Sequence, residues 1–263
     1  MKAPVLVSRH GGTLLITLNR SERRNAFDLD MRSAIADAVF MARDTAQVKA
    51  VVLTGSGGCF CAGGDLKSLS AEERPIHADR ERIRRLHPWF RELVNIEKPV
   101  IAAVEGAAFG AGFNLALACD FILGAPSARF SAVFARIGLV PDLGGLFLLP
   151  RIVGLQRAKE LVFSARELGA EEAKRMGIVY AIHPAEKLID EALALAGRFE
   201  DASTETLGMA KNILNRSFNL DQDTLAELEA FAQALAVHTE YHKDAVKRFL
   251  AKQPLAFRWD KDA

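Results

Sequence analysis

The chain has 263 residues, of which half are apolar and a quarter are charged, and its formal net charge is +1 at pH 7. This length and composition are typical of one large soluble domain, or of one domain with an appendage. The balanced charge gives no general reason to expect a nucleic-acid partner, and no apolar run is long enough to cross a bilayer. The first residues enter a strand-like stretch without a secretory or transit leader, so we expect a cytoplasmic protein.

The first third of the chain predicts a hairpin, a helix and a strand. The runs Val5–Val7 and Leu14–Leu18, with two glycines between them, are typical of a hairpin. Apolar residues at helical spacing from Met31 to Ala42 predict an amphipathic helix, and Ala50–Thr54 predicts a buried strand.

A charged stretch from residue 70 to residue 85 follows, and its low apolar content predicts a solvated segment. Apolar residues from Ile83 to Val94 then recur at helical spacing, with Pro88 expected to kink that helix.

The middle of the chain alternates strands with helices, which favours a partly parallel sheet. Val100–Val104 and Phe121–Leu123 are typical of strands, and Phe113–Ala118 lies between them as a helix. From about residue 184 the pattern is entirely helical, with expected helices at Ala185–Arg198, Thr204–Ser217, Leu220–Tyr241 and Lys243–Ala251. We therefore divide the chain into a core of residues 1–200 and a helical region of residues 201–263, whose large apolar faces favour self-association.

Two glycine-rich loops are the most informative feature of the sequence. They run from Cys59 to Leu66 and from Gly106 to Phe113, and each follows an apolar strand. Glycine and alanine leave backbone N–H groups uncovered, and a following helix aims its amino end at whatever lies there. Two such donors that converge on one oxygen form an oxyanion hole. The loops therefore predict an enzyme that stabilises an enolate or a tetrahedral oxyanion.

These loops and their flanking segments resemble the crotonase (enoyl-CoA hydratase/isomerase) superfamily over nearly the whole chain. The segments that carry the resemblance are Leu18-Asn19-Arg20, Arg23-Arg24-Asn25-Ala26, Phe60-Cys61-Ala62-Gly63-Gly64-Asp65-Leu66, Lys98 to Gly106, Ala118-Cys119-Asp120, Gly138 to Gly145, Gly154-Leu155-Gln156-Arg157-Ala158, Glu171-Glu172-Ala173 and Gly177-Ile178-Val179. The resemblance implies an α/β fold, a crotonase-like spiral of ββα units with a C-terminal helical trimerisation region. It also implies a homotrimer or a dimer of trimers that acts on an acyl-CoA substrate. Coenzyme A would be part of that substrate, with no other cofactor and no metal.

The resemblance also implies positions for the ligand. The backbone N–H groups of Gly64 and Ala111 would donate to the thioester oxygen. Arginine suits the CoA phosphates, and either Arg23 or Arg24 could supply it. The full set expected along CoA is Arg23, Arg24, Ala26, Ala62, Gly63, Gly64, Asp65 and Leu66. From the C-terminal helices, Lys243, Lys252 and Phe257 are candidates to reach the nucleotide of this subunit or of an adjacent one.

The acid/base residue is the next question. Hydratases of the superfamily use two glutamates, which would fall at Asn114 and Phe134, and neither position carries a carboxylate here. Asp142 lies where several members, notably ring-epoxide isomerases of phenylacetyl-CoA breakdown and some enoyl-CoA isomerases, place a functional aspartate. One carboxylate suffices for a 1,3-proton shift. An aspartate before two glycines and an apolar run is also typical of a helix N-cap, and Asp142 could serve both roles.

Aromatic residues are expected around this carboxylate. Phe109, Phe113, Phe130 and Phe134 are predicted to line the acyl pocket. Such apolar surroundings would raise the pKa of Asp142 by desolvation. The leading hypothesis is therefore double-bond or ring-epoxide isomerisation through Asp142.

Three alternatives stay open. A conventional 2-enoyl-CoA hydratase would have to use Asn114 together with Asp142. An aryl-CoA dehalogenase would use Asp142 as nucleophile and His87 to activate water, although the apolar neighbours of His87 at helical spacing favour a packed histidine. A non-catalytic CoA- or RNA-binding relative would draw on the basic cluster Arg80, Arg82, Arg84 and Arg85, which is more typical of a solvated face.

Overall fold

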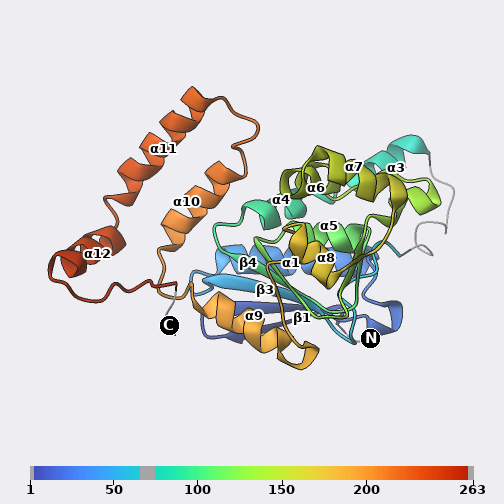
Figure 1. Cartoon of the computed structure of the whole chain (residues 1–263), viewed down its shortest axis with the longest axis horizontal. Helices are drawn as coiled ribbons and strands as arrows, with labels where there is room; N and C mark the ends of the chain where they lie inside the picture. The colour runs from blue at the N-terminus through green and yellow to red at the C-terminus, as the bar shows by residue number, and fades with distance from the viewer. Residues whose placement is uncertain (1–2, 66–74, 260–263) are drawn as a thin grey trace.

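The computed structural model describes residues 3–65 and 75–259 and contains two sheets (Figure 1). The larger sheet has six strands in the order β1-β2-β3-β4-β6-β9. These strands are β1 (Val5–His10), β2 (Thr13–Leu18), β3 (Ala50–Gly55), β4 (Val100–Val104), β6 (Phe121–Gly124) and β9 (Ala181–Ile182). The hairpin β1–β2 is antiparallel and every other pairing within this sheet is parallel, so the expected hairpin and partly parallel sheet are confirmed.

From β4 to β7 the chain passes back and forth between the two sheets. The smaller sheet consists of β5 (Ala107–Phe109), β7 (Arg129–Ser131) and β8 (Leu168–Gly169). Strand β4 is followed by β5 and helix α5 (Ala111–Leu117). Strand β6 is followed by β7, the 3-10 helix η2 (Val133–Ile137) and α6 (Gly145–Val153). This repeated step is the predicted spiral of ββα units.

Both faces of the larger sheet are covered by helices. Helix α1 (Leu29–Asp44) begins at Asp28, whose side chain accepts a hydrogen bond from the N–H of Met31 at 2.9 Å, and α1 buries Met31 and Ile35 in the main core. Side chains alternate along each strand, so Val52 and Ile101 face the other way and join a second buried cluster with α9 (Leu188–Gly197).

The stretch before β4 differs from the sequence prediction. Two separate helices are present, α3 (Ile76–Arg84) and α4 (His87–Asn95), because Pro88 lies in the first turn of α4. The prediction of a single kinked helix was therefore wrong. The stretch expected to be solvated is helical from Ile76 onward, and its residues before Pro75 lie outside the described part of the chain.

Seven further helices are described, two of them short 3-10 helices. They are η1 (Ser21–Arg23), α7 (Leu155–Ser164), α8 (Ala170–Arg175), η3 (Ala185–Lys187), α10 (Thr204–Leu214), α11 (Gln222–Ala236) and α12 (Glu240–Leu250). An ion pair of 2.7 Å between Lys211 and Asp120 ties α10 to the core, whereas α11 and α12 extend away from the sheets (Figure 1). The boundary at residue 200 and a trimerisation role for this region stay predictions. Over residues 3–65 and 75–259, no helix is long and apolar enough to cross a membrane.

Candidate active site

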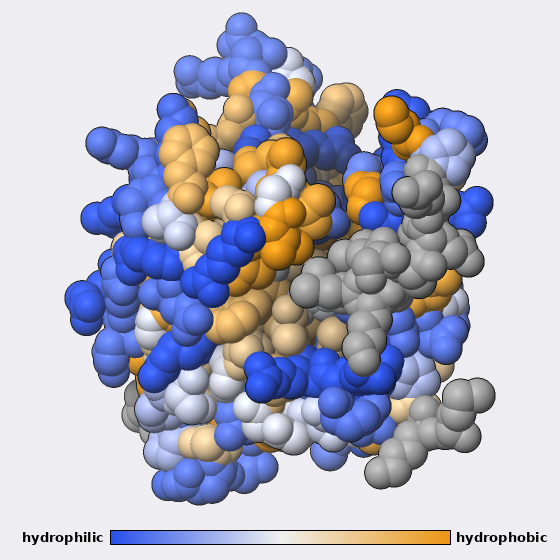
Figure 2. All heavy atoms as spheres, turned by 90° about the vertical axis from the view of Figure 1, so that its right-hand side faces the viewer, coloured by the Kyte–Doolittle hydropathy of each residue, from blue (hydrophilic) through white to orange (hydrophobic). Residues whose placement is uncertain are grey.

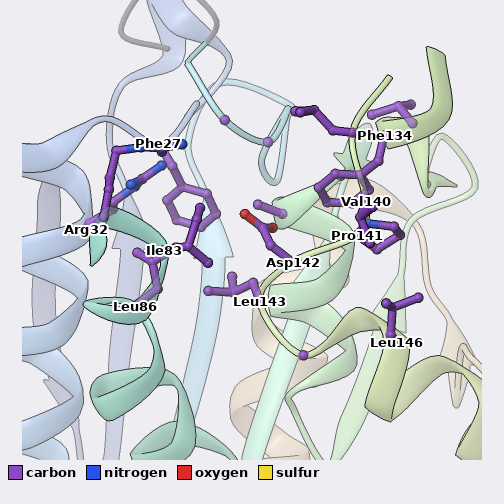
Figure 3. A pocket seen from close by; sticks show the side chains of 18 of the residues that line it. Phe27, Arg32, Ile83, Leu86, Phe134, Val140, Pro141, Asp142, Leu143 and Leu146 are labelled. Atoms are coloured by element: carbon purple, nitrogen blue, oxygen red, sulfur yellow. The ribbon is translucent and has the colours of Figure 1, made fainter. Parts of the chain in front are cut away.

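A cavity of about 770 Å³ opens between α1, α3, α4, the two glycine loops and the segment from Val133 to Phe147. Phe27, Arg32, Ile83 and Leu86 lie on one side of it, and Phe134, Val140, Pro141 and Leu146 lie on the other (Figure 3). Apolar side chains gather on the molecular face toward which α3 projects, with strongly hydrophilic side chains at their border (Figure 2). The cavity can thus hold an apolar group whose polar end reaches solvent.

The two glycine loops meet at this cavity, as their sequence predicts. The N–H of Phe109 donates to the carbonyl of Cys61 at 2.9 Å. A Cβ added at Gly112 would lie 2.2 Å from that same carbonyl oxygen, so the loops can touch only because residue 112 is glycine. A Cβ at Gly63, whose φ is +97°, would lie 3.5 Å from the nitrogen of Ala111.

Gly64 and Ala111 each present a backbone N–H at the cavity wall. Both residues line the cavity, and in the part of the chain that the structure describes neither N–H donates a hydrogen bond to a protein atom. Ala111 is the first residue of α5, so its N–H has no acceptor within its own helix. Two uncommitted donors on touching loops can bind one oxygen atom and stabilise negative charge on it.

The segment proposed to contact CoA runs beside the first glycine loop. The N–H of Phe27 donates to the carbonyl of Gly63 at 2.8 Å, and the N–H of Ala62 donates to the carbonyl of Arg24 at 2.9 Å. Arg23 and Arg24 are exposed, whereas Ala26 is buried and does not line the cavity. Leu66 lies outside the described residues.

Asn25 holds this segment in place, a role that its sequence context does not predict. The residue is fully buried with a φ of +55°. Its Nδ2 donates to the carbonyls of Ser56 and Cys59 at 2.9 and 2.6 Å, and its Oδ1 accepts from the N–H of Arg20 at 2.8 Å. The sequence around Asn25 does not predict this role, because Ser56 and Cys59 are brought to it only by the fold.

Asp142 projects its carboxylate into the cavity (Figure 3). Among the described residues, its Oδ1 is buried without a hydrogen-bond partner. This burial raises the pKa of Asp142, and the nearby positive groups of Arg32, Arg82 and His87 oppose the rise. A carboxylate that is short of hydrogen bonds and partly desolvated is suited to taking up a proton.

The helix-cap interpretation of Asp142 is wrong. Helix α6 begins after Gly144, which is its N-cap, and no described side chain caps this end of the helix. Leu143 and Gly144 have φ values of +44° and +70°, so the chain turns sharply between the aspartate and the helix. That turn aims Asp142 at the cavity instead of at the helix N-terminus.

Asn114 lies behind Asp142. It is 2% exposed, does not line the cavity, and donates from Nδ2 to the backbone carbonyl of Asp142 at 2.8 Å. A Cβ added at Gly145 would lie 2.4 Å from the side-chain nitrogen of Asn114, so the contact also requires glycine at position 145. The side chain fixes the backbone that carries the aspartate and is not placed to activate a water in the cavity.

Only one of the four predicted pocket phenylalanines lines the cavity, namely Phe134. Phe113 and Phe130 are fully buried and pack against each other with ring centroids 5.7 Å apart, because α5 and β7 turn these positions into the core. Phe109 is half-buried and lies outside the lining. The aromatic lining comes instead from Phe27, Trp89, Phe134 and Phe147.

His87 is the first residue of α4, is exposed and lines the cavity, so the packed-histidine interpretation is wrong. The cavity lining also contains three arginines that the site prediction missed, Arg32 on α1, Arg82 on α3 and Arg136 in η2. Arg82 is one of the four arginines of the basic cluster considered for RNA binding. Its neighbours Arg84 and Arg85 are exposed and form ion pairs with Glu81 at 4.0 and 3.7 Å.

The C-terminal candidates do not contribute to this cavity. Lys243, Lys252 and Phe257 are absent from its lining, and Lys243 is 2.6 Å from Glu240. Helix α12, which carries Lys243, lies at the opposite end of the molecule from α3 (Figure 1). Contact with CoA in an adjacent subunit stays a prediction. Of the residues that the structure describes, no three histidine, cysteine, aspartate or glutamate side chains are grouped as metal ligands.

The ββα spiral and its cavity define a class of α/β proteins, and sequence comparison gives the family. The chain belongs to the enoyl-CoA hydratase/isomerase family, whose model matches residues 8–260. A 1,2-epoxyphenylacetyl-CoA isomerase of Escherichia coli K12 is 36% identical over 94% of this chain and 95% of its own. A crotonyl-CoA hydratase of Syntrophomonas wolfei is 33% identical over 96% of this chain and 97% of its own.

A solved structure extends this likeness to three dimensions. An enoyl-CoA hydratase/isomerase from Cupriavidus metallidurans CH34 superposes with a TM-score of 0.92 at 41% identity, covering 97% of this chain and 96% of that one. The sequence relatives include both an isomerase and a hydratase. The choice between these reactions therefore depends on the residues of the cavity.

Proposed function

We propose that the protein isomerises an acyl-CoA thioester, with Asp142 as the acid/base group. One observation carries the proposal: among the described residues that line the cavity, Asp142 is the only carboxylate, and its Oδ1 has no hydrogen-bond partner. A hydratase with two glutamates would need a second carboxylate at this cavity. The corresponding positions hold Asn114, which is buried behind the wall, and Phe134.

The proposed reaction is a proton transfer between two carbons. The thioester oxygen of a 3-enoyl-CoA accepts hydrogen bonds from the N–H groups of Gly64 and Ala111, which stabilise the enolate as it forms. Asp142 removes the proton from the α-carbon, and the resulting carboxylic acid returns a proton to the γ-carbon. The double bond thereby moves into conjugation with the carbonyl. The raised pKa of Asp142 brings its basicity nearer to that of a useful base at neutral pH.

Binding of the CoA moiety is assigned to the segment that pairs with the first glycine loop. Arg23 and Arg24 are exposed there and can reach phosphate. The backbone from Ala62 to Asp65 is hydrogen-bonded to this segment and runs beside it. The relative named 1,2-epoxyphenylacetyl-CoA isomerase makes an aryl epoxide thioester the second substrate to test.

A second candidate function is hydrolytic dehalogenation of an aryl-CoA, because His87 is exposed at the same cavity as Asp142. In that reaction a carboxylate oxygen of Asp142 attacks the ring carbon and halide leaves. His87 then takes a proton from a water that cleaves the resulting ester. Release of halide ion distinguishes this reaction from isomerisation.

The proposed assembly is a homotrimer or a dimer of trimers. Its support is the apolar surface of the helices that extend from the core, where Phe231 is 69% and Phe249 is 71% exposed. Large exposed apolar side chains on projecting helices favour contact with another subunit. Light scattering that gives the mass of a single chain would contradict this assembly.

The function is tested by incubating the protein with 3-hexenoyl-CoA and following the absorbance of the conjugated thioester. We expect the native protein to isomerise this substrate and Asp142→Asn to lose about 100-fold or more in rate. Asp37→Asn is the matched control, because Asp37 is exposed on α1 and away from the cavity lining. Faster hydration of crotonyl-CoA, chloride release from 4-chlorobenzoyl-CoA, or full activity in Asp142→Asn would each contradict the proposal.

A further inference from the structure

The cavity contains more positive charge than its acid/base chemistry requires. Its described lining includes three arginines, Arg32, Arg82 and Arg136, against the single carboxylate of Asp142. The other lining side chains are almost all apolar. A hydrocarbon acyl chain would fill this space and leave the guanidinium of Arg32, which has no ion pair among the described residues, desolvated without a counter-ion, which is unfavourable.

Arg32 is the least satisfied of these groups. It is half-buried on α1, and among the described residues its guanidinium forms neither a hydrogen bond nor an ion pair. Burial and the charge of Arg82 both lower the pKa of Arg32. Asp28, the other carboxylate whose charge acts on Arg32, already pairs with Arg20 at 2.6 Å.

Arg82 approaches the same region from α3. Its Nε lies 3.3 Å from Asp79, and its two terminal nitrogens form no hydrogen bond within the described part of the chain. Arg136 is different, because its Nη2 donates to the carbonyl of Ala165 at 2.7 Å. Arg32 lies beside Phe27, across the cavity from Val140 and Pro141 (Figure 3). Arg32 and Arg82 therefore form the cationic part of the wall that faces the Asp142 segment.

We propose that the acyl group of the substrate carries a carboxylate of its own, which Arg32 and Arg82 bind while Asp142 acts at the α-carbon. The substrate class is the CoA monothioester of a dicarboxylic acid. This inference rests on the proposed function, since it takes the cavity to be the acyl site. A guanidinium pairs well with a carboxylate because its planar fork can donate two parallel hydrogen bonds.

A phosphate of CoA is the other anion that could meet these arginines. Arg32 and Arg82 line the same cavity as Asp142, the proposed acid/base group, and therefore lie on the acyl side of the substrate. The CoA phosphates are assigned to Arg23 and Arg24, which are exposed outside the cavity lining. The acyl carboxylate therefore fits the position of Arg32 and Arg82 better than a phosphate does.

Calorimetric titration with two unreactive ligands tests the inference. Glutaryl-CoA and pentanoyl-CoA have acyl chains of equal length and differ in the terminal carboxylate, and free CoA provides the phosphate control. We expect the native protein to bind glutaryl-CoA about 10-fold or more tightly than pentanoyl-CoA, the size of a hydrogen bond to a charged group. Arg32→Met and Arg82→Met should each lose most of this preference. Arg84→Met, which removes an exposed charge two residues from Arg82 on the same helix, should keep it.

Three results would overturn the inference: equal or tighter binding of pentanoyl-CoA by the native protein, the same loss of preference in Arg84→Met, or an equal loss of affinity for free CoA in Arg32→Met. The last would assign the arginines to a phosphate. Because these ligands do not react, binding is measured separately from turnover. Isomerisation without the glutaryl preference would overturn this inference alone, whereas the preference without isomerisation would contradict only the proposed reaction.

Discussion

The side chain of Asn114 donates a hydrogen bond of 2.8 Å to the backbone carbonyl of Asp142. Asn114 belongs to α5, the helix that begins at Ala111, and Asp142 lies in the turn before α6. The same short helix thus presents one proposed oxyanion donor and fixes the backbone of the proposed base. The thioester oxygen and the α-carbon of a substrate lie a fixed distance apart. The N–H of Ala111 and the carboxylate of Asp142 must therefore also keep a fixed distance from each other.

Replacement of Asn114 by aspartate tests this link, because it preserves volume and removes the donor. We expect Asn114→Asp to lower kcat about 10-fold by misplacing Asp142, with little change in KM. Asn215→Asp is the control, since Asn215 also donates to a carbonyl, that of Val94 at 2.9 Å, far along the chain. A fall in KM alone, or equal losses in both variants, would contradict the positioning role.

Contact between the glycine loops predicts that replacing Gly112 by a larger residue destabilises the protein. The Cβ of alanine at this position would lie 2.2 Å from the carbonyl oxygen of Cys61. We expect Gly112→Ala to reduce the free energy of unfolding by about 1–3 kcal/mol, as other overpacked sites do. Gly197→Ala in α9, where an added Cβ meets nothing within 4 Å, should cause no loss. Denaturant titration of both variants measures the difference, and equal stabilities would contradict the close contact.

The pH dependence of kcat/KM follows from the ionisation of Asp142. The base must be deprotonated, and burial raises its pKa, so activity should fall with decreasing pH at a midpoint above the ordinary aspartate value of about 3.9. Arg32 opposes that rise, so Arg32→Met should move the acidic limb to higher pH. Arg84→Met is again the control. An acidic limb that moves to lower pH in Arg32→Met would show that another group titrates.

The same ionisation predicts that Asp142 costs stability at neutral pH. Because its pKa is higher in the folded than in the unfolded state, the folded protein binds more protons between the two values, and stability decreases as pH rises through this interval. The penalty is fully present above the folded-state pKa. Asp142→Asn, which imitates the protonated form, should therefore raise the free energy of unfolding by about 1 kcal/mol, a typical size for a single stabilising substitution.

Thermal unfolding as a function of pH measures this effect. The advantage of Asp142→Asn should disappear as pH falls below the unfolded-state value. Asp37→Asn, with an exposed carboxylate, should show no such advantage at pH 7. A destabilised Asp142→Asn at pH 7 would mean that the carboxylate is held by favourable interactions.

The fold was largely predictable because its strands and helices have strong local patterns. Val100–Val104 is apolar throughout and is buried throughout, since helices cover both faces of the sheet. The touching glycine loops were also predictable, because small residues recur after two neighbouring parallel strands. The residues around them have no comparable local signal.

The cavity lining depends on contacts between distant segments. Phe130 was placed in the pocket, but β7 turns it into the core against Phe113. Arg32 and Arg82 are far apart in sequence, and only the packing of α1 and α3 brings them to one cavity. A pattern in one helix cannot predict where the neighbouring helix will place its charges.

The most direct test of the central claim follows the transferred hydrogen itself. A 3-enoyl-CoA carrying deuterium at the α-carbon is converted in ordinary water, and the product is analysed by mass spectrometry and NMR. If Asp142 is the single acid/base group in a desolvated site, part of the deuterium should appear at the γ-carbon with the native protein, and Asp142→Asn should form almost no product. Product formed by Asp142→Asn at the native rate would contradict the claim that this aspartate carries the proton.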